Sequence, residues 1–159
     1  MIAIRRKVQT DGLLFAQAWR ERYGSSRIVS RGQARDAASL QGLVAEDGGA
    51  VVGVVTWAQE GGRFEIVTLD SFVEDHGVGT ALLDAAVAEA RKKGAHRAWL
   101  VTTNDNIRAL RFYQRRGWNM AALHRGAVDE ARKLKPEIPA TGADGIPIRH
   151  EIEFELRLA

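Results

Sequence analysis

The sequence is most constrained by residues 64–94, which predict a buried strand, a glycine-rich turn and a long helix in that order. The turn contains Gly77 and Gly79, and the helix predicted over residues 80–93 has one apolar face and ends at Gly94. Backbone N–H groups exposed where such a turn enters a helix bind anions, most often the phosphates of a ligand. The stretch therefore predicts part of a sheet together with a phosphate-binding site.

The rest of the pattern predicts a mixed α/β domain. Strands are expected at residues 2–8, 40–46, 50–59, 62–72, 97–103, 118–124 and 151–158, and further helices at residues 11–23, 106–116 and 126–135. Glycine-rich turns between the second, third and fourth strands indicate an antiparallel meander. A strand, a helix and a strand over residues 62–103 imply a right-handed crossover with one parallel pair. We therefore expect a central, mostly antiparallel sheet of six to seven strands with helices on both faces.

Residues 25–38 have no clear hydrophobic period. We expect them to form a loop or a short helix, and they are a candidate lip over a binding site.

The composition indicates one soluble globular domain over residues 1–159. Lys and Arg number 23 against 20 Asp and Glu, an excess that is small for a nucleic-acid surface. No apolar run approaches membrane-spanning length and the N-terminus does not resemble a secretory signal, so we expect a cytoplasmic protein without a membrane partner. The absence of cysteine excludes disulfides and a Cys nucleophile. The four histidines lack ligand spacing, so no metal site is expected.

Two common phosphate-binding motifs are excluded by the residues that follow the glycines. A P-loop requires Gly-Lys-Ser/Thr, whereas Thr80 and Ala81 follow Gly79. A dinucleotide-binding fingerprint requires a third glycine near Leu82, where none occurs.

Two blocks of the sequence resemble the GCN5-related N-acetyltransferase (GNAT) family. Residues 74–83 (EDHGVGTALL) resemble the family's acetyl-CoA signature, R/Q-x-x-G-x-G/A at the start of a helix. Residues 106–118 (NIRALRFYQRRGW) resemble its second block, N-x-x-A-x-x-F-Y followed by a Gly-aromatic pair. With a meander before and a strand pair after them, the match extends over about residues 40–158. The resemblance implies a GNAT fold, acetyl-CoA as co-substrate and N-acetylation as the activity.

The signature departs from the family at two positions. Glu74 stands where Arg or Gln is usual and Asp75 where Gly is common, and two acids are unfavourable beside a pyrophosphate. The donors are the main-chain N–H groups of residues 76–80, which do not depend on the side chain at position 74. We therefore expect the phosphate site to persist, either with lower affinity or with a proton on His76 that offsets the acids.

The resemblance implies roles for particular residues. The cofactor-binding residues are Leu69, His76, Gly77, Val78, Gly79, Thr80, Asn104, Asn106 and Tyr113. A main-chain N–H near Leu69 would polarise the thioester carbonyl, and Asn104 and Asn106 would bind the pantetheine arm, although helix capping is an alternative for Asn106. Tyr113 is the candidate general acid for the departing thiolate, because a phenol and an alkanethiol have similar pKa values; its alternative role is core packing.

Glu65 is the candidate general base, acting directly or through water. It lies on the strand that leads into the signature, and we expect it to share a face with Val67 and Leu69. An exposed position or an ion pair is the alternative for Glu65. Asp70 is the second candidate base, and a substrate amine of low pKa would need none.

The implied partner is a primary amine on a small molecule or a protein, attacked directly in a ternary complex. Trp19, Trp57 and His124 are candidate residues of the acceptor pocket. A homodimer is left open as the oligomeric state. Two alternatives to the enzyme remain: a non-catalytic acyl-CoA-binding sensor with the same fold, and a basic domain associated with nucleic acid, which the mild charge makes the weaker of the two.

Overall fold

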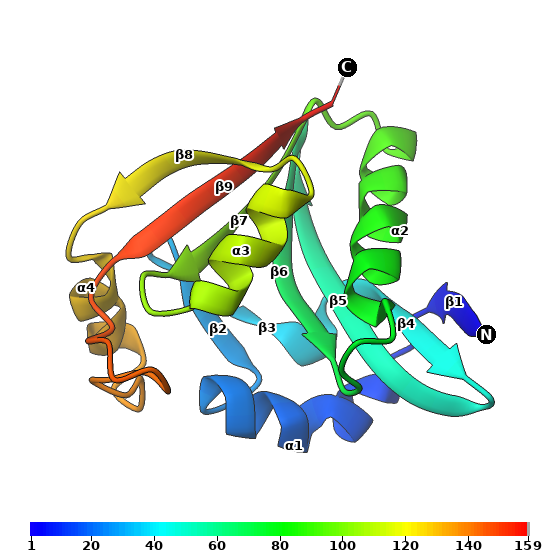
Figure 1. Ribbon diagram of the computed structural model, residues 1–159, viewed down its shortest axis with the longest axis horizontal. Coiled ribbons are helices and arrows are strands. Elements are labelled where there is room, and N and C mark those ends of the chain that lie inside the picture. Colours follow the sequence, from blue (N-terminus) through cyan, green and yellow to red (C-terminus); the bar gives the residue numbers. More distant parts are fainter. Residues whose placement is uncertain (159) are drawn as a thin grey trace.

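The computed structural model describes residues 1–158, in which seven strands form one mixed sheet (Figure 1). These strands are β1 (Ile2–Arg6), β4 (Gln41–Asp47), β5 (Ala50–Glu60), β6 (Arg63–Ser71), β7 (Arg97–Thr103), β8 (Asn119–His124) and β9 (Glu151–Arg157). The α-helices are α1 (Asp11–Tyr23), α2 (Val78–Lys92), α3 (Ile107–Arg115) and α4 (Ala127–Leu134). The spatial order is β1-β4-β5-β6-β7-β9-β8, with every neighbouring pair antiparallel except β6 and β7. The expected fold class is confirmed.

Helices cover both faces of the sheet, as expected. On one face α2 and α3 enclose the larger apolar cluster, in which Phe64, Leu82 and Phe154 are fully buried. On the other face α1 buries Phe15 and Trp19 in a smaller cluster. The sheet is therefore a rigid wall between two packed layers, and ligand-binding residues at its strand ends are held in place.

The parallel pair of β6 and β7 is short, and this determines where a ligand can enter the sheet. Its register begins at Arg63 opposite Arg97 and ends at Glu65 opposite Trp99. Beyond that point β6 is paired with β5 and β7 with β9, and the two strands diverge (Figure 1). Beyond Glu65 and Trp99, the main-chain groups on the facing edges of β6 and β7 are not hydrogen-bonded to each other and are available to a ligand.

A β-bulge in β6 corrects one expectation about Glu65. Thr56 of β5 lies opposite Thr68, whereas the next residue of β5 lies opposite Ile66, so Val67 is an extra residue in β6. An extra residue reverses the alternation of side chains that follow it. Glu65 therefore shares a face with Thr68 and Asp70, and the expectation that it shares one with Val67 and Leu69 was wrong.

Residues 25–38 fold differently from the loop or short helix that their sequence predicts. They form a hairpin of β2 (Arg27–Ser30) and β3 (Gln33–Asp36), followed by a 3₁₀ turn at Ala37–Ser39. Arg31 and Gly32 connect the strands with φ angles of 49° and 74°, the left-handed pair that a tight hairpin turn requires. The strands are too short and too polar for a period-two pattern to be visible in the sequence.

Candidate active site

The N-terminus of α2 presents free main-chain donors. Gly77 precedes the helix with a φ of 71°, and no side chain caps the helix. The first main-chain bond of the helix runs from the N–H of Ala81 to the carbonyl of Gly77. The N–H groups of Val78, Gly79 and Thr80 therefore have no partner within the helix, which is the arrangement an anion requires.

Two arginines of the second sequence block lie beside this helix end. Arg108 donates to the carboxylate of Glu74 at 3.0 Å in an exposed ion pair, which offsets only part of the charge of the acid that departs from the signature. Arg116 donates to Oγ1 of Thr80 from Nε and Nη2, at 2.9 and 2.7 Å, while its guanidinium lies 3.7 Å from the ring centroid of Phe112. Sequence reasoning missed Arg116, because only the packing of α3 beside α2 brings it to Thr80.

A cavity of about 700 Å³ opens between the diverging strands. From the sheet it is lined by Glu65, Ile66, Val67 and Leu69 of β6 and by Leu100, Val101, Thr102 and Thr103 of β7. Asn106, Ala109 and Tyr113 add the wall from α3, and residues of α1, β2 and α4 close the opposite side. The fold thus brings together Glu65, Leu69, Asn106 and Tyr113, four residues that the sequence singled out.

Tyr113 is buried in the wall of this cavity. Its ring centroid lies 5.7 Å from that of Phe154 and 5.8 Å from that of Trp118, so the residue also packs in the core. Burial raises the pKa of the Tyr113 phenol, the charge of Asp70 raises it further, and Arg116 opposes both. Within residues 1–158 no hydrogen bond occupies its hydroxyl. The phenol therefore holds its proton at neutral pH and can donate it to a ligand.

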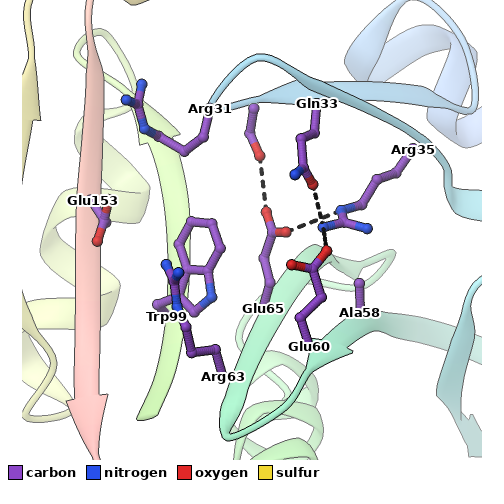
Figure 2. Close-up of a pocket in the computed structure, with 10 residues that line it drawn as sticks. Arg31, Gln33, Arg35, Ala58, Glu60, Arg63, Glu65, Trp99 and Glu153 are labelled. Carbon is purple, nitrogen blue, oxygen red and sulfur yellow. Dashed lines mark hydrogen bonds and ion pairs between the residues drawn. The ribbon is translucent and has the colours of Figure 1, made fainter.

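Glu65 is buried at the point where the strands separate, with 4% of its surface exposed. Its carboxylate accepts hydrogen bonds from Oγ of Ser30 at 2.9 Å and from Nε of Arg35 at 3.1 Å (Figure 2). Burial raises the pKa of Glu65, and these two donors oppose the rise. A carboxylate with a raised pKa accepts a proton more readily, which suits the role of a general base.

Asp70, the second candidate base, lies outside the cavity. Its carboxylate is fully buried and accepts from Nε1 of Trp19 at 3.0 Å, from Arg22 at 3.1 Å and from the hydroxyl of Tyr23 at 2.9 Å. All three donors belong to α1. Asp70 therefore joins α1 to the sheet, and three donors of that helix hold its two oxygens.

Asn104 is also held away from the cavity. Its Oδ1 accepts from the N–H groups of Arg149 and His150, both at 2.9 Å, and its Nδ2 donates to the carbonyl of Pro147 at 2.9 Å. The amide thus fixes the end of the segment between α4 and β9, and these three hydrogen bonds hold it outside the cavity wall. Asn106, by contrast, lines the cavity and caps α3 with the same side chain.

The other expected residues also lie outside the cavity wall, including residues 76–80 of the signature. Trp19 and Trp57 are buried in the two apolar clusters, and His124 donates to or accepts from Glu153 at 2.9 Å. None of these three lines the cavity among the residues that the structure describes, so the expected acceptor-pocket roles were wrong. His76 is exposed in the turn before α2, where its Nδ1 contacts the carbonyl of Glu74.

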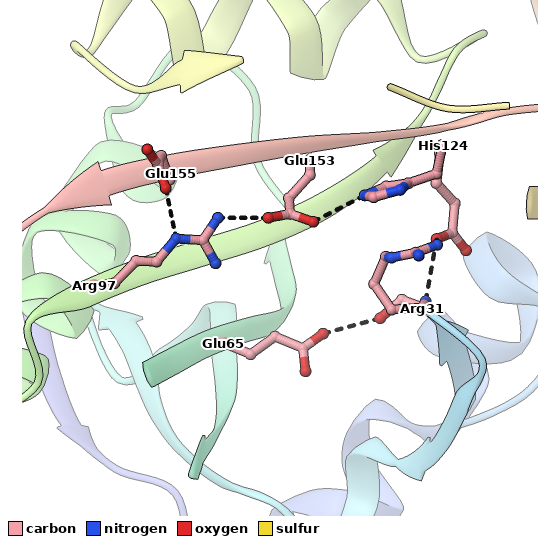
Figure 3. A network of polar contacts seen from close by, with 8 residues as sticks. Arg31, Glu65, Arg97, His124, Glu153 and Glu155 are labelled. Carbon is pink, nitrogen blue, oxygen red and sulfur yellow. Dashed lines mark hydrogen bonds and ion pairs between the residues drawn. The ribbon is translucent and has the colours of Figure 1, made fainter. Parts of the chain in front are cut away.

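Glutamates of β9 anchor the hairpin and the far side of the sheet (Figure 3). Glu151 accepts from the main chain and the side chain of Arg31, both at 3.1 Å, which ties the β2–β3 turn to β9. Burial would raise the pKa of Glu153, but Arg97 and His124 outweigh it and hold that pKa below its usual range. The hairpin is therefore fixed over the sheet face that carries Glu65, as the expected lip.

Two other features are absent from the part of the chain that the structure describes. Over residues 1–158, no group of three or more His, Asp or Glu side chains is arranged to hold a metal ion. In the same part of the chain, no helix combines the length and the apolar character needed to cross a membrane.

Comparison with known proteins identifies the same fold. The sequence model of the Acetyltransferase (GNAT) family matches residues 12–118. The uncharacterized protein YxbD of Bacillus subtilis (strain 168) is 39% identical over 140 residues, which cover 87% of this chain and 88% of that protein.

Solved structures resemble the whole chain. An IAA acetyltransferase from Bacillus cereus ATCC 14579 has a TM-score of 0.74 at 20% identity, covering 99% of this chain and 100% of its own. A GNAT family acetyltransferase from Elizabethkingia anophelis, with acetyl-CoA bound, has a TM-score of 0.73 at 17% identity, covering 99% and 98%. The family model covers the diverging strands, the N-terminus of α2 and the whole of the second block. The chain belongs to the GNAT family of acetyltransferases.

Proposed function

We propose that residues 1–159 form a single acetyltransferase domain that transfers the acetyl group of acetyl-CoA to a primary amine. The observation that carries the proposal is the cavity between β6 and β7, with Glu65 and Tyr113 in its wall, together with the uncapped N-terminus of α2, the helix that follows β6. This reaction needs hydrogen-bond donors that hold the phosphates of acetyl-CoA, an apolar channel, a proton donor and a proton acceptor.

The residues present fit acetyl-CoA. The amides of residues 78–80 suit a diphosphate, and Arg116 adds a positive charge beside them. The separated edge of β6 near Leu69 supplies main-chain groups for an amide-containing arm. The Elizabethkingia relative of the same fold has acetyl-CoA bound, which supports the assignment.

The chemistry assigns one proton to each of two residues. Acetyl-CoA supplies the thioester. The acceptor nitrogen forms a bond to the acetyl carbon as the carbon–sulfur bond breaks, so the amine must lose a proton and the sulfur must gain one. An alkylamine with a pKa near 10.4 is almost fully protonated at neutral pH. The ammonium group therefore loses two protons. Glu65 takes the first, directly or through water, which frees the amine for attack; the second leaves the nitrogen as the amide forms and replaces the proton that Tyr113 gives to the sulfur.

Direct transfer follows from the absence of a Cys nucleophile in the sequence. The test is release of free CoA thiol from acetyl-CoA across a panel of small amines and peptides, with the wild type and Tyr113→Phe compared. We expect turnover to fall at least about 10²-fold in the variant while acetyl-CoA binding, measured by calorimetry, is unchanged. Binding without turnover of any amine by the wild type would indicate the non-catalytic sensor instead.

A further inference from the structure

A second, smaller cavity of about 220 Å³ lies beside the first (Figure 2). The two share Ser30 and Glu65 as a common wall. The rest of the smaller cavity is built from the β2–β3 hairpin above and from β6 and β7 below, with Arg63 and Trp99 on the sheet side. Glu65 therefore faces both cavities, and a molecule that bridges them passes this carboxylate.

Most charges around the small cavity are already paired. Arg35 donates to Glu65 at 3.1 Å and to Glu60 at 3.3 Å, and Arg97 pairs with Glu153. Arg63 differs, because among residues 1–158 it forms neither an ion pair nor a side-chain hydrogen bond. Its guanidinium lies over the indole of Trp99, 5.3 Å from the ring centroid, at the rim of the cavity.

Trp99 supplies a second unused donor. The residue is 9% exposed, and its Nε1 is the one buried side-chain nitrogen or oxygen without a hydrogen-bond partner in the described part of the chain. A buried N–H without an acceptor is unfavourable, so native proteins seldom keep one without a reason. The indole and Arg63 therefore leave unused hydrogen-bond donors at one place in the wall.

We propose that the small cavity binds a carboxylate of the acceptor, so that the acceptor is a small amine that also carries a free carboxylate, such as an amino acid or a short peptide. Arg63 and Glu65 lie two residues apart on one strand face, and Trp99 lies opposite Glu65. The Arg63 and Glu65 positions are thus about 7 Å apart along the strand, so the carboxylate and the amine of one small molecule can reach both side chains. This inference rests on the proposed function for its amine, but the carboxylate site can be tested without turnover.

The kinetic test compares acceptors that differ only in that carboxylate. Each is offered as the free acid and as the carboxamide, at matched amine pKa, to the wild type, to Arg63→Met and to Arg91→Met, a control on the exposed end of α2. We expect the wild type and Arg91→Met to prefer the free acid by about 10- to 100-fold in kcat/KM, mainly through KM. Arg63→Met should lose that preference and keep its rate with the carboxamide. Equal use of both forms by the wild type would overturn the proposal and leave the proposed function intact.

The binding test needs no acetyl-CoA. The indole N–H signal of Trp99, assigned by its loss in Trp99→Phe, is followed in ¹H–¹⁵N spectra as the free acid or the carboxamide is added. We expect the free acid alone to shift this signal, and Arg63→Met to abolish the shift. A shift without turnover of any amine would support the carboxylate site and contradict the proposed function. An unmoved signal with both forms would refute the site.

Discussion

Glu65 of β6 lies directly opposite Trp99 of β7 in the last pair of the parallel ladder. This pair marks the point where the two strands separate, so the buried carboxylate stands at the closed end of the gap between them. On one side of Glu65 is the large cavity with Tyr113, and on the other is the small cavity with Arg63. The position explains how one side chain can serve an amine that is held between two binding regions.

Replacing Glu65 by Gln keeps its size and removes the proton acceptor. We expect kcat to fall by about 10²-fold or more, because general base catalysis typically contributes that much. Glu60→Gln is the matched control: Glu60 lines the same small cavity and pairs with Arg35, but its side chain is 69% exposed. That variant should keep most of its activity.

The pH dependence of kcat provides an independent readout for Glu65. The base must be ionised, and burial raises its pKa above the usual value for a glutamate. In the wild type kcat should therefore rise with pH until the raised pKa is passed and then level off. An identical acid limb in Glu65→Gln would show that another group is the base.

Gly77 and Gly94 allow the anion site to be tested with a built-in control. They flank the two ends of α2 with φ angles of 71° and 74°, and neither has a neighbour within 4 Å of an added Cβ. Alanine at either position should cost about 1 kcal/mol in stability through backbone strain, measured by urea unfolding. Only Gly77→Ala should also weaken acetyl-CoA binding, by about fivefold or more in calorimetry, because it disturbs the amides that follow. Equal binding by both variants would place the phosphates elsewhere.

The sequence predicted the elements whose signal is local. The helix expected at residues 80–93 is observed at Val78–Lys92, because its apolar face and its terminating glycine lie within a few turns of one another. The single parallel pair followed from the order of a strand, a helix and a strand. Of the two blocks that resemble the GNAT family, the first forms the N-terminus of α2 and the second supplies part of the cavity wall.

Features that depend on distant partners could not be predicted. The bulge at Val67 is defined by the pairing of β6 with β5. The residues that share a sheet face with Glu65 could therefore not be derived from the sequence of β6 alone. Asn104 is bound by a carbonyl 43 residues away, and Arg116 by a hydroxyl 36 residues away. These contacts decide which candidate residues reach the cavity, and no spacing within the sequence indicates them.

Glu74 should weaken the affinity for acetyl-CoA, since it places a negative charge beside the phosphate site. We expect Glu74→Gln to tighten binding by about two- to fivefold at low salt, because it also releases Arg108 from its ion pair. Asp84→Asn removes the same charge from an exposed position within α2 and should change little. The gain should shrink at high salt, which screens exposed charges. Unchanged or weaker binding by Glu74→Gln would mean that Glu74 does not oppose the ligand.

Asp70 should matter for stability more than for catalysis, because it lies between α1 and the sheet. Asp70→Asn replaces one carboxylate oxygen by an amide that faces the donors of Trp19, Arg22 and Tyr23. We expect a loss of about 1–3 kcal/mol in the free energy of unfolding at neutral pH, with kcat little changed in the folded fraction. Glu21→Gln, an exposed position on the same helix, should be close to neutral.

The loss of stability caused by Asp70→Asn should depend on pH with a definite sign. Burial raises the pKa of Asp70, and hydrogen bonds from Tyr23, Trp19 and Arg22 only partly oppose it. The folded protein thus binds this proton more tightly than the unfolded chain, whose aspartates titrate near about 3.9. Between the pKa of an aspartate in the unfolded chain and the raised pKa of Asp70 in the folded protein, ionisation of Asp70 lowers the stability of the wild type but not of Asp70→Asn. The difference in the free energy of unfolding between the wild type and Asp70→Asn should therefore narrow as pH rises through this window. Urea unfolding at several pH values measures it. A difference that widens with pH would show that the carboxyl is instead stabilised in its charged form.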